Sequence, residues 1–375
     1  MINKKRLIAT FKTLVRIDSL SLREAKGARY VQRELKKLGI RSAQVGRPNG
    51  GDAGNIVAFL PGKPLDYSRG KGPVILLNAH LDTVSPGRNI RPLEKNGLIR
   101  TNGQTVLGAD NKAGVAAILE ILKTIKEKKL AQPPLQIIFT VAEEIGIVGA
   151  KALPAAALKA DFGFALDGGQ INKVLNKAPT QYNLTARIIG RAAHAGVHPE
   201  QGVNAIRVAS EAIAKMRLGR IDRETTANIG LIKGGKATNI IPEEVEIRGE
   251  ARSHDLGKLR RQVAQMEKTL RSACRRHHAK LILRVEKMYN AFAVGRESAV
   301  MRLALAGLKR SKIKPVVKPS GGGSDANIFN ARGVPTLVLG LGARNLHTTR
   351  EELKIRDFIK GTEMILNIVM GEQNG

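Results

Sequence analysis

Two kinds of apolar pattern follow one another along the first 170 residues. Apolar side chains recur at the spacing of one helix face in residues 7–15, 25–38 and 115–125. Apolar runs without polar alternation, which are typical of buried strands, lie at 55–60, 74–82, 135–144 and 162–167. Helices that alternate with such strands predict an α/β fold, with a mostly parallel sheet flanked by helices on both faces. The stretch SLRE at 21–24 also predicts a capping box at the start of the second helix.

The order of elements changes near residue 177. Strand and helix patterns then follow as β-α-β-β-α-β, at 180–190, 200–217, 226–235, 243–253, 255–276 and 279–289. This order predicts a small ferredoxin-like α+β domain. After residue 291 the earlier pattern resumes, with another buried strand within 334–342. We therefore predict one domain made of 1–176 and 291–375, with 177–290 inserted into it as a second domain.

The composition narrows the class of protein. A chain of 375 residues is longer than one hydrophobic core usually serves, which favours two domains. No run of 18 or more apolar residues predicts a membrane span, and Lys12 interrupts the apolar run near the start in a way that argues against a signal peptide. The single cysteine, Cys274, excludes an intrachain disulfide and fits a reducing compartment. We expect a cytoplasmic protein that does not bind a membrane.

The net charge of +31 raises the possibility of a nucleic-acid partner. A binding surface needs concentrated charge, however, and the inserted segment and the rest of the chain have a similar charge density. Aromatic residues make up 3% and tryptophan is absent, so side chains that could stack on bases are scarce. We expect no specific nucleic-acid partner. The competing hypothesis is a polyanion-binding protein on an old enzyme fold, whose binding would weaken steeply with salt and would not need zinc.

Acidic and histidine residues follow the predicted strand ends and one helix start: His80, Asp82, Asp110, Glu143, Glu144, Asp167 and His347. Ligands of parallel sheets bind at the carboxyl ends of the strands, so one cleft could collect all of these side chains. Imidazole nitrogens and carboxylate oxygens are ordinary zinc ligands. A set this large exceeds one tetrahedral site and suits two metal ions that share a bridging carboxylate and a hydroxide. Taken alone, each residue has a simpler explanation, such as a helix cap for Asp110.

The adjacent pair Glu143 and Glu144 need not have one role. Neighbouring residues of an extended strand point to opposite sides, so these two carboxylates cannot easily bind the same metal pair equally. One of them can bind metal while the other takes a proton from the water and returns it to the leaving amine.

Motifs along nearly the whole chain resemble one enzyme family. LLNAHLDTV, GADNKAG, TVAEEIGIVGAK, FALDGG and LGARNLHTTREE resemble the di-zinc exopeptidase and deacylase family of peptidase T, glutamate carboxypeptidase and acetylornithine deacetylase. The resemblance implies that the metal ligands are His80, Asp110, Glu144, Asp167 and His347, with Asp110 bridging. It also implies that Glu143 is the general base and that Asp82 orients the ligand histidine. The implied cofactor is two zinc ions per subunit, although cobalt or manganese could replace them.

The same resemblance assigns roles inside the inserted domain. It implies that His194 stabilises the oxyanion in the active site of the other subunit, and that Asn239 contacts the transition-state oxygen. Arg252 would bind the terminal carboxylate of the substrate, with a structural salt bridge as the alternative. The glycine-rich segment 319–329 would line the substrate pocket. The inserted domain is thus expected to act as a lid and to form a homodimer.

These features predict a di-zinc exopeptidase similar to peptidase T that cleaves short peptides. An N-acyl-amino-acid deacylase or a carboxypeptidase of the same fold is the alternative, because either needs the same metal pair and only a different pocket.

Overall fold

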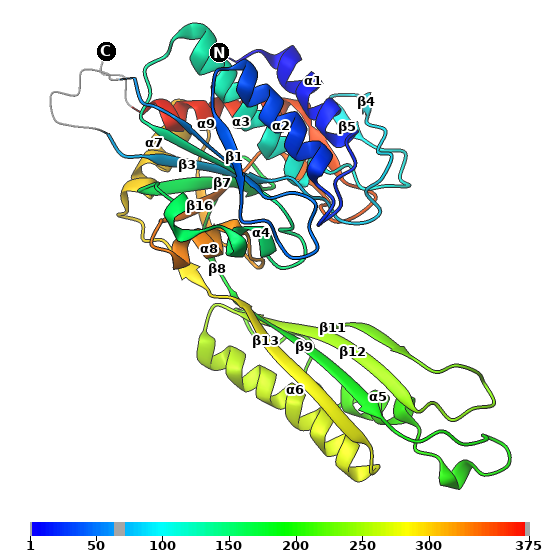
Figure 1. Ribbon diagram of the computed structural model, residues 1–375. Helices are drawn as coiled ribbons and strands as arrows, with labels where there is room; N and C mark the ends of the chain where they lie inside the picture. The colour runs from blue at the N-terminus through cyan, green and yellow to red at the C-terminus, as the bar shows by residue number, and fades with distance from the viewer. Residues whose placement is uncertain (1, 64–71, 372–375) are drawn as a thin grey trace. The chain divides into compact units, whose positions relative to one another are not determined.

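The chain forms two compact units. The computed structural model describes residues 2–63 and 72–371. The first unit comprises residues 1–176, 293–320 and 324–375, and the second comprises 177–292 and 321–323 (Figure 1). The chain leaves and re-enters the first unit at neighbouring positions, since the Val294 N–H donates to the Asn176 carbonyl at 2.8 Å and Asn176 Nδ2 donates to the Val294 carbonyl at 2.9 Å.

The central sheet of the first unit confirms the predicted parallel core. Its strands are β1 (Ser42–Val45), β2 (Asn55–Leu60), β3 (Ile75–His80), β6 (Leu135–Thr140), β7 (Phe162–Gly168), β8 (Lys173–Ala178), β14 (Phe292–Ala293), β15 (Val316–Pro319) and β16 (Thr336–Gly340). They lie in the order β1-β2-β6-β3-β7-β16-β8-β14, with β15 paired to β8. Strands β6, β3, β7 and β16 run parallel, so their carboxyl ends share one edge. Strands β1, β2 and β8 add antiparallel pairs on the two sides.

Helices cover both faces of this sheet, as predicted. They are α1 (Lys4–Val15), α2 (Ala25–Lys37), α3 (Ala109–Lys128), α4 (Val148–Ala152), the 3₁₀ turn η1 (Ala155–Ala157), α7 (Ala299–Arg310), α8 (Asp325–Ala331) and α9 (Ile355–Met370). Helices α1, α3 and α9 lie over one face, while α4 and α8 lie over the other (Figure 1). Leu76 packs in a cluster with Phe329 of α8, whereas Ala79 lies beside Gly114 of α3. These strand residues point to opposite faces, as the strand period requires.

The predicted capping box at 21–24 is wrong. Helix α2 begins at Ala25, and Glu24 at its N-cap makes no side-chain cap bond. The Ser21 hydroxyl instead donates to Asp82 at 2.7 Å. The Glu24 carboxylate accepts the Ala142 N–H at 2.8 Å. Although Glu24 also accepts the nearby Leu22 N–H, both side chains bond to segments distant in sequence, which a local pattern cannot reveal.

The second unit confirms the β-α-β-β-α-β order. It contains β9 (Thr180–Ile189), the 3₁₀ turn η2 (Pro199–Gln201), α5 (Ala205–Ala214), β10 (Gly219–Arg220), β11 (Thr225–Gly234), β12 (Glu244–Ser253), α6 (Leu256–Arg276) and β13 (Lys280–Tyr289). The strands are antiparallel in the order β10-β11-β12-β9-β13, and α5 and α6 contact each other and the sheet. A separate apolar core fills the space between helices and sheet. The predicted helix 200–217 begins later, because Asn204 caps α5 by accepting the Arg207 N–H.

A small antiparallel sheet in the first unit was not predicted. Its strands are β4 (Leu93–Lys95), β5 (Leu98–Arg100), β17 (Ala343–Arg344) and β18 (Glu352–Lys354), in the order β17-β18-β5-β4. Strands of two or three residues are too short to leave a periodic pattern. This sheet joins the late segment 343–354 to the segment that precedes α3.

Within the described residues, none of the helices combines the length and apolar character that crossing a bilayer requires.

We expect Gly114→Ala to destabilise the first unit. A Cβ at position 114 would lie 2.3 Å from Asn111 Oδ1 and 2.7 Å from the Leu166 carbonyl oxygen, so α3 would have to move away from the end of β7. Such overpacking costs about 1–3 kcal/mol, which urea unfolding can measure. Gly27→Ala in α2 is the matched control, because the nearest neighbour of its Cβ lies at 4.0 Å. This control should leave stability unchanged or raise it by about 0.5–1 kcal/mol, and equal effects of the two changes would contradict the packing argument.

Candidate metal centre

The first unit brings together all the predicted metal-site side chains of that unit. They come from the end of β3, the loop after β6, the end of β7, the first turn of α3 and the loop between β17 and β18: His80, Asp82, Glu143, Glu144, Asp167, Asp110 and His347. Because β6, β3 and β7 are adjacent and parallel, their carboxyl ends deliver three of these segments to the same edge. Asp110 is not the cap of α3, since Gly108 occupies that position.

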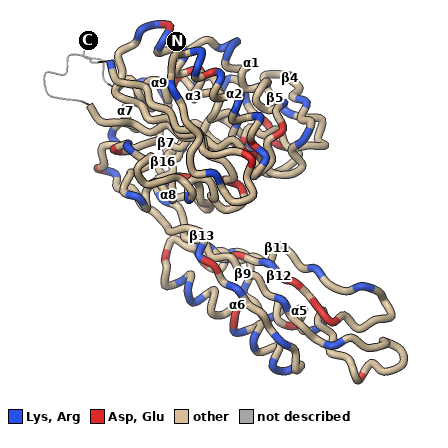
Figure 2. The backbone as a smooth tube through the Cα atoms, viewed as in Figure 1, with Lys and Arg blue, Asp and Glu red and all other residues tan. Residues whose placement is uncertain are grey.

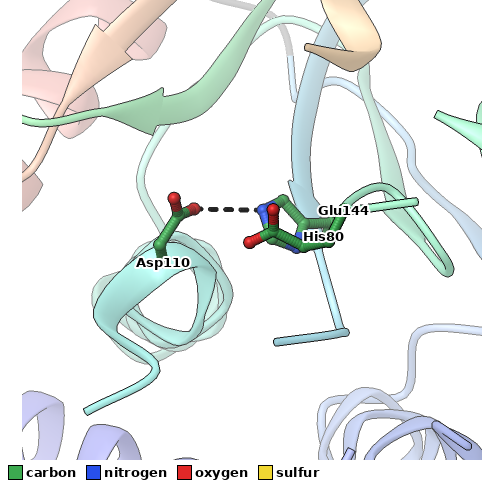
Figure 3. Close-up of side chains that lie close together, drawn as sticks. All are labelled: His80, Asp110 and Glu144. Atoms are coloured by element: carbon green, nitrogen blue, oxygen red, sulfur yellow. Dashed lines mark hydrogen bonds and ion pairs between the residues drawn. The ribbon is translucent and has the colours of Figure 1, made fainter. Parts of the chain in front are cut away.

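Asp110 lies between two groups of donor atoms. Its Oδ1 atom lies 3.1 Å from His80 Nε2, which is itself 3.5 Å from Asp167 Oδ1. Its Oδ2 atom lies 3.3 Å from His347 Nε2, which is 3.0 Å from Glu144 Oε2. Figure 3 shows the His80, Asp110 and Glu144 side chains converging on one space. Each oxygen of Asp110 thus faces a different histidine and a different second carboxylate.

The electrostatics of this arrangement suit a cation. Burial raises the pKa of Asp167 to about 8, with a further rise from the nearby Asp110 charge. Burial likewise raises the pKa of Glu143 well above its ordinary value. Glu144 Oε1 is buried without a hydrogen-bond partner in the described part of the chain. Ligand atoms of His80, Asp110 and Glu144 lie within 4.8 Å of one another. Crowded carboxylates and an unpartnered buried oxygen fit bound metal, which would satisfy both.

Asp82 fixes the segments that carry the donors. Its side chain is fully buried, with Oδ1 accepting the Glu143 N–H at 3.0 Å and Oδ2 accepting the Glu144 N–H at 3.1 Å. Oδ1 also lies 3.3 Å from His80 Nδ1. Burial opposes ionisation of Asp82, but its contact with His80 prevails and lowers the pKa. One carboxylate therefore accepts both N–H groups of the Glu143–Glu144 backbone and contacts the His80 ring, whose Nδ1 also lies 3.1 Å from the Asp82 carbonyl oxygen.

The two adjacent glutamates have different surroundings. The Glu144 carboxylate contacts His347 and, through it, the group around Asp110. The Glu143 residue is buried, with only 9% of its surface exposed. Its carboxylate nevertheless has no hydrogen-bond or ion-pair partner among residues 2–63 and 72–371. A buried carboxylate without a protein partner is available to a bound molecule.

Sequence reasoning missed several buried charged residues near this site: Glu24, Lys112, Asp325 and Glu351. Lys112 donates to Ser19 and to the Leu81 carbonyl, and burial lowers its pKa to about 8. Asp325 accepts from Thr140 and from Asn78 Nδ2. The sequence did offer one indication of these residues, because some of them lie inside or next to the motifs that carry the predicted metal ligands. The lysine of GADNKAG is an example.

The other predicted site residues belong to the second unit. His194 and Asn239 lie on neighbouring segments, because the Ala195 N–H donates to the Asn239 carbonyl at 3.0 Å, and both residues are exposed. Arg252 Nε and Nη2 donate to the Glu250 carboxylate at 2.8 and 2.9 Å. The ion pair considered as the alternative for Arg252 is therefore present.

The glycine-rich segment 319–329 is divided between the units, with Gly321–Gly323 in the second. A Cβ at Gly323 would lie 2.4 Å from Tyr289 Oη, so glycine permits the close approach of loop and ring.

Comparison with known proteins places this chain in a family. The sequence profile of peptidase family M20/M25/M40 matches residues 76–371. The uncharacterized protein YqjE of Bacillus subtilis is 39% identical, over 98% of this chain and 99% of the relative. A tripeptidase structure from Staphylococcus aureus superposes with a TM-score of 0.89 at 37% identity, covering 99% of this chain and 98% of the other. The aminopeptidase PepT structure from Bacillus cereus gives 0.83 at 38% identity, covering 98% of each chain.

The chain belongs to peptidase family M20/M25/M40. Within that family it is a peptidase T-like member, which confirms the resemblance of its motifs and the predicted class of exopeptidase-type hydrolase. The comparison also confirms the α/β fold with an inserted α+β domain.

We expect Asp82→Asn to lower the free energy of unfolding of the metal-free protein by about 1–3 kcal/mol. The new amide nitrogen would face one of the Glu143 and Glu144 N–H donors, leaving a buried donor without an acceptor. Urea unfolding in chelator measures the loss. Asp161→Asn is the control, because the exposed Asp161 accepts the Val74 N–H at 2.7 Å and water can replace it. A similar cost for both variants would show that Asp82 does not have the proposed orienting role.

Proposed function

We propose that this protein is a metal-dependent exopeptidase that hydrolyses an amide bond of short peptides, tripeptides in particular. The observation that carries the proposal is the division of donors around Asp110, in which each carboxylate oxygen faces its own histidine. The names of the S. aureus tripeptidase and the B. cereus aminopeptidase support the choice of substrate.

The donor set divides into two metal positions that share Asp110. His80, Asp167 and Asp110 Oδ1 would hold one ion, and His347, Glu144 and Asp110 Oδ2 would hold the other. Nitrogen and oxygen donors without a thiolate suit two zinc ions, and cobalt or manganese would find the same donors acceptable. Bound there, such a pair would lower the pKa of a water molecule and polarise the scissile carbonyl.

Glu143 is the proton carrier in this proposal. Its carboxylate takes a proton from the attacking water and returns it to the leaving amine nitrogen. Burial raises the pKa of Glu143, and a base is most effective when its pKa approaches the working pH. Asp82 keeps Glu143 in place through the backbone N–H, so the base is oriented without losing its free oxygens.

The inserted unit supplies substrate contacts and a dimer interface in this proposal. The exposed neighbours His194 and Asn239 would contact the substrate, His194 in the partner subunit's site. Arg252 would bind the substrate's terminal carboxylate in competition with Glu250. Exposed apolar side chains on β11, Leu231 and Ile232, support an interface between two copies of this chain.

Lysine and arginine are spread over both units (Figure 2). This distribution supports the expectation of no specific nucleic-acid partner. A location in the cytoplasm also stays a prediction.

We expect Glu143→Gln and Glu144→Gln to fail in different ways. Glu143→Gln should keep bound metal and lose turnover by about 10²–10⁴-fold, because only the proton carrier is removed. Glu144→Gln should lose metal as well, because His347 would keep only Asp110 as its carboxylate neighbour. Elemental analysis and peptide hydrolysis measure the two effects, with exposed Glu297→Gln as the control. Equal metal contents and activities for both site variants would refute the division of roles.

Tripeptides with a free amino terminus should be hydrolysed, whereas N-acetylated amino acids should not. Chelation should abolish the hydrolysis and added zinc should restore it, since the donor atoms are arranged for cations. The assay compares initial rates on unblocked tripeptides, their N-acetylated forms and acetylated amino acids. Hydrolysis of acetylated amino acids alone would establish the deacylase alternative, and activity that survives complete metal removal would exclude a metal mechanism.

A further inference from the structure

Glu351 joins two parts of the metal centre that are far apart in sequence. It is 2% exposed and directly precedes β18, in the segment that carries His347. Its Oε2 atom accepts the N–H groups of Leu107 at 2.8 Å and Gly108 at 2.7 Å. Its Oε1 atom accepts the Asp110 N–H at 3.0 Å. The carboxylate thus binds the backbone that enters α3.

This backbone needs an external acceptor. Gly108 has a φ of +72° and Asp110 has a non-helical φ/ψ of −83° and 101°. The first N–H groups of a helix also lack intrahelical partners, so a buried entry of this kind needs an acceptor from elsewhere. A carboxylate is the strongest acceptor that a protein offers to backbone N–H groups. Glu351 supplies this acceptor to the N–H groups of Leu107, Gly108 and Asp110.

The same residue also closes the loop of the other ligand. The Glu351 N–H donates to the Thr348 carbonyl at 3.0 Å, in the turn that follows His347. The main chain of Glu351 thus belongs to the His347 loop, while its side chain holds Asp110. His347 Nε2 and Asp110 Oδ2 meet at 3.3 Å between these two anchored segments.

We propose that Glu351 is a positioning residue that sets the placement of Asp110 relative to His347 and so tunes metal affinity. The proposal rests on the proposed function, because it assumes that these side chains bind metal. It adds a residue outside the ligand set, one that acts through the backbone rather than by touching the ion. Partners behind the ligands typically change metal affinity by about 10–100-fold.

The substitution E351Q tests this geometry atom by atom. If the glutamine oxygen keeps the Leu107 and Gly108 donors, its NH₂ group must face the Asp110 N–H, and two donors cannot bond to each other. The Asp110 N–H would then have lost its hydrogen-bond acceptor. The substitution E351D keeps the charge, but its side chain is one methylene shorter. Its two oxygens therefore cannot reach the N–H groups of Leu107, Gly108 and Asp110 at the same time. The matched control is E352Q, a change of the same type at the next residue, whose side chain is half-buried.

The experiment titrates zinc into the metal-free full chain against a chromophoric chelator. Amide hydrogen exchange of residues 105–112 and the thermal midpoint of each metal-free protein are measured alongside. We expect E351Q to weaken zinc binding by about 10–100-fold and to speed exchange in 105–112. E351D should give a smaller loss, and E352Q should match the wild type.

Wild-type zinc affinity in E351Q, even with a lower thermal midpoint, would show that Glu351 is merely structural and would overturn the proposal. If E351Q does not fold, the zinc affinity of E351D is the test. Wild-type zinc affinity in E351D would show that the length of the side chain at position 351 does not affect metal binding, and it would overturn the proposal. A wild-type chain that binds no zinc would overturn the proposed function and this inference together. Loss of affinity in E351Q with a zinc-binding wild type supports both.

Discussion

The concentration of buried carboxylates at one edge of the sheet is the constraint on which the rest of the first unit depends. Asp82, Glu143, Glu144 and Asp167 lie at or just after strand ends and Asp110 lies in the first turn of α3, and all five are buried or part-buried. The protein offsets this charge in two ways. Carboxylates behind the site accept backbone N–H groups, and those in front face histidines and the space that cations would occupy. Burial and the neighbouring carboxylates nevertheless raise the pKa values of Glu143 and Asp167.

The supporting carboxylates have a shared mode of action. Asp82, Glu24 and Glu351 each accept main-chain N–H groups of a loop that carries donor residues. Such loops have irregular backbone conformations, with Ala142 and His347 at positive φ, and therefore cannot satisfy their own N–H groups by helix or sheet bonding. A buried carboxylate supplies the missing acceptor and leaves the donor side chain free to face forward. The parallel strands bring the loops to one edge, and these acceptors determine their final positions.

The sequence allowed prediction of the parts of this arrangement that have a periodic or motif signature. The parallel strands follow from apolar runs, and the donors follow from their positions at the ends of those runs. The capping box at 21–24 failed because Ser21 and Glu24 have the right local spacing but find partners at Asp82 and Ala142. The sheet formed by β4, β5, β17 and β18 has strands too short for a pattern. Lys112 and Glu351 escaped notice because burial of a charge depends on distant segments that a linear pattern does not show.

The paired positions Asn176 and Val294 have a consequence for how such a protein can change over time. The inserted segment between them begins and ends at hydrogen-bonded neighbours. Its two ends therefore lie side by side in the first unit, like the ends of a hairpin. The entropy of closing a connection grows only with the logarithm of its length, and the inserted unit has its own core. The insert thus has a core of its own, and its two ends meet at one hydrogen-bonded pair of residues. Sequence changes in the insert, including those at its exposed tip near His194, thus fall outside the segments that carry the donor side chains of the first unit.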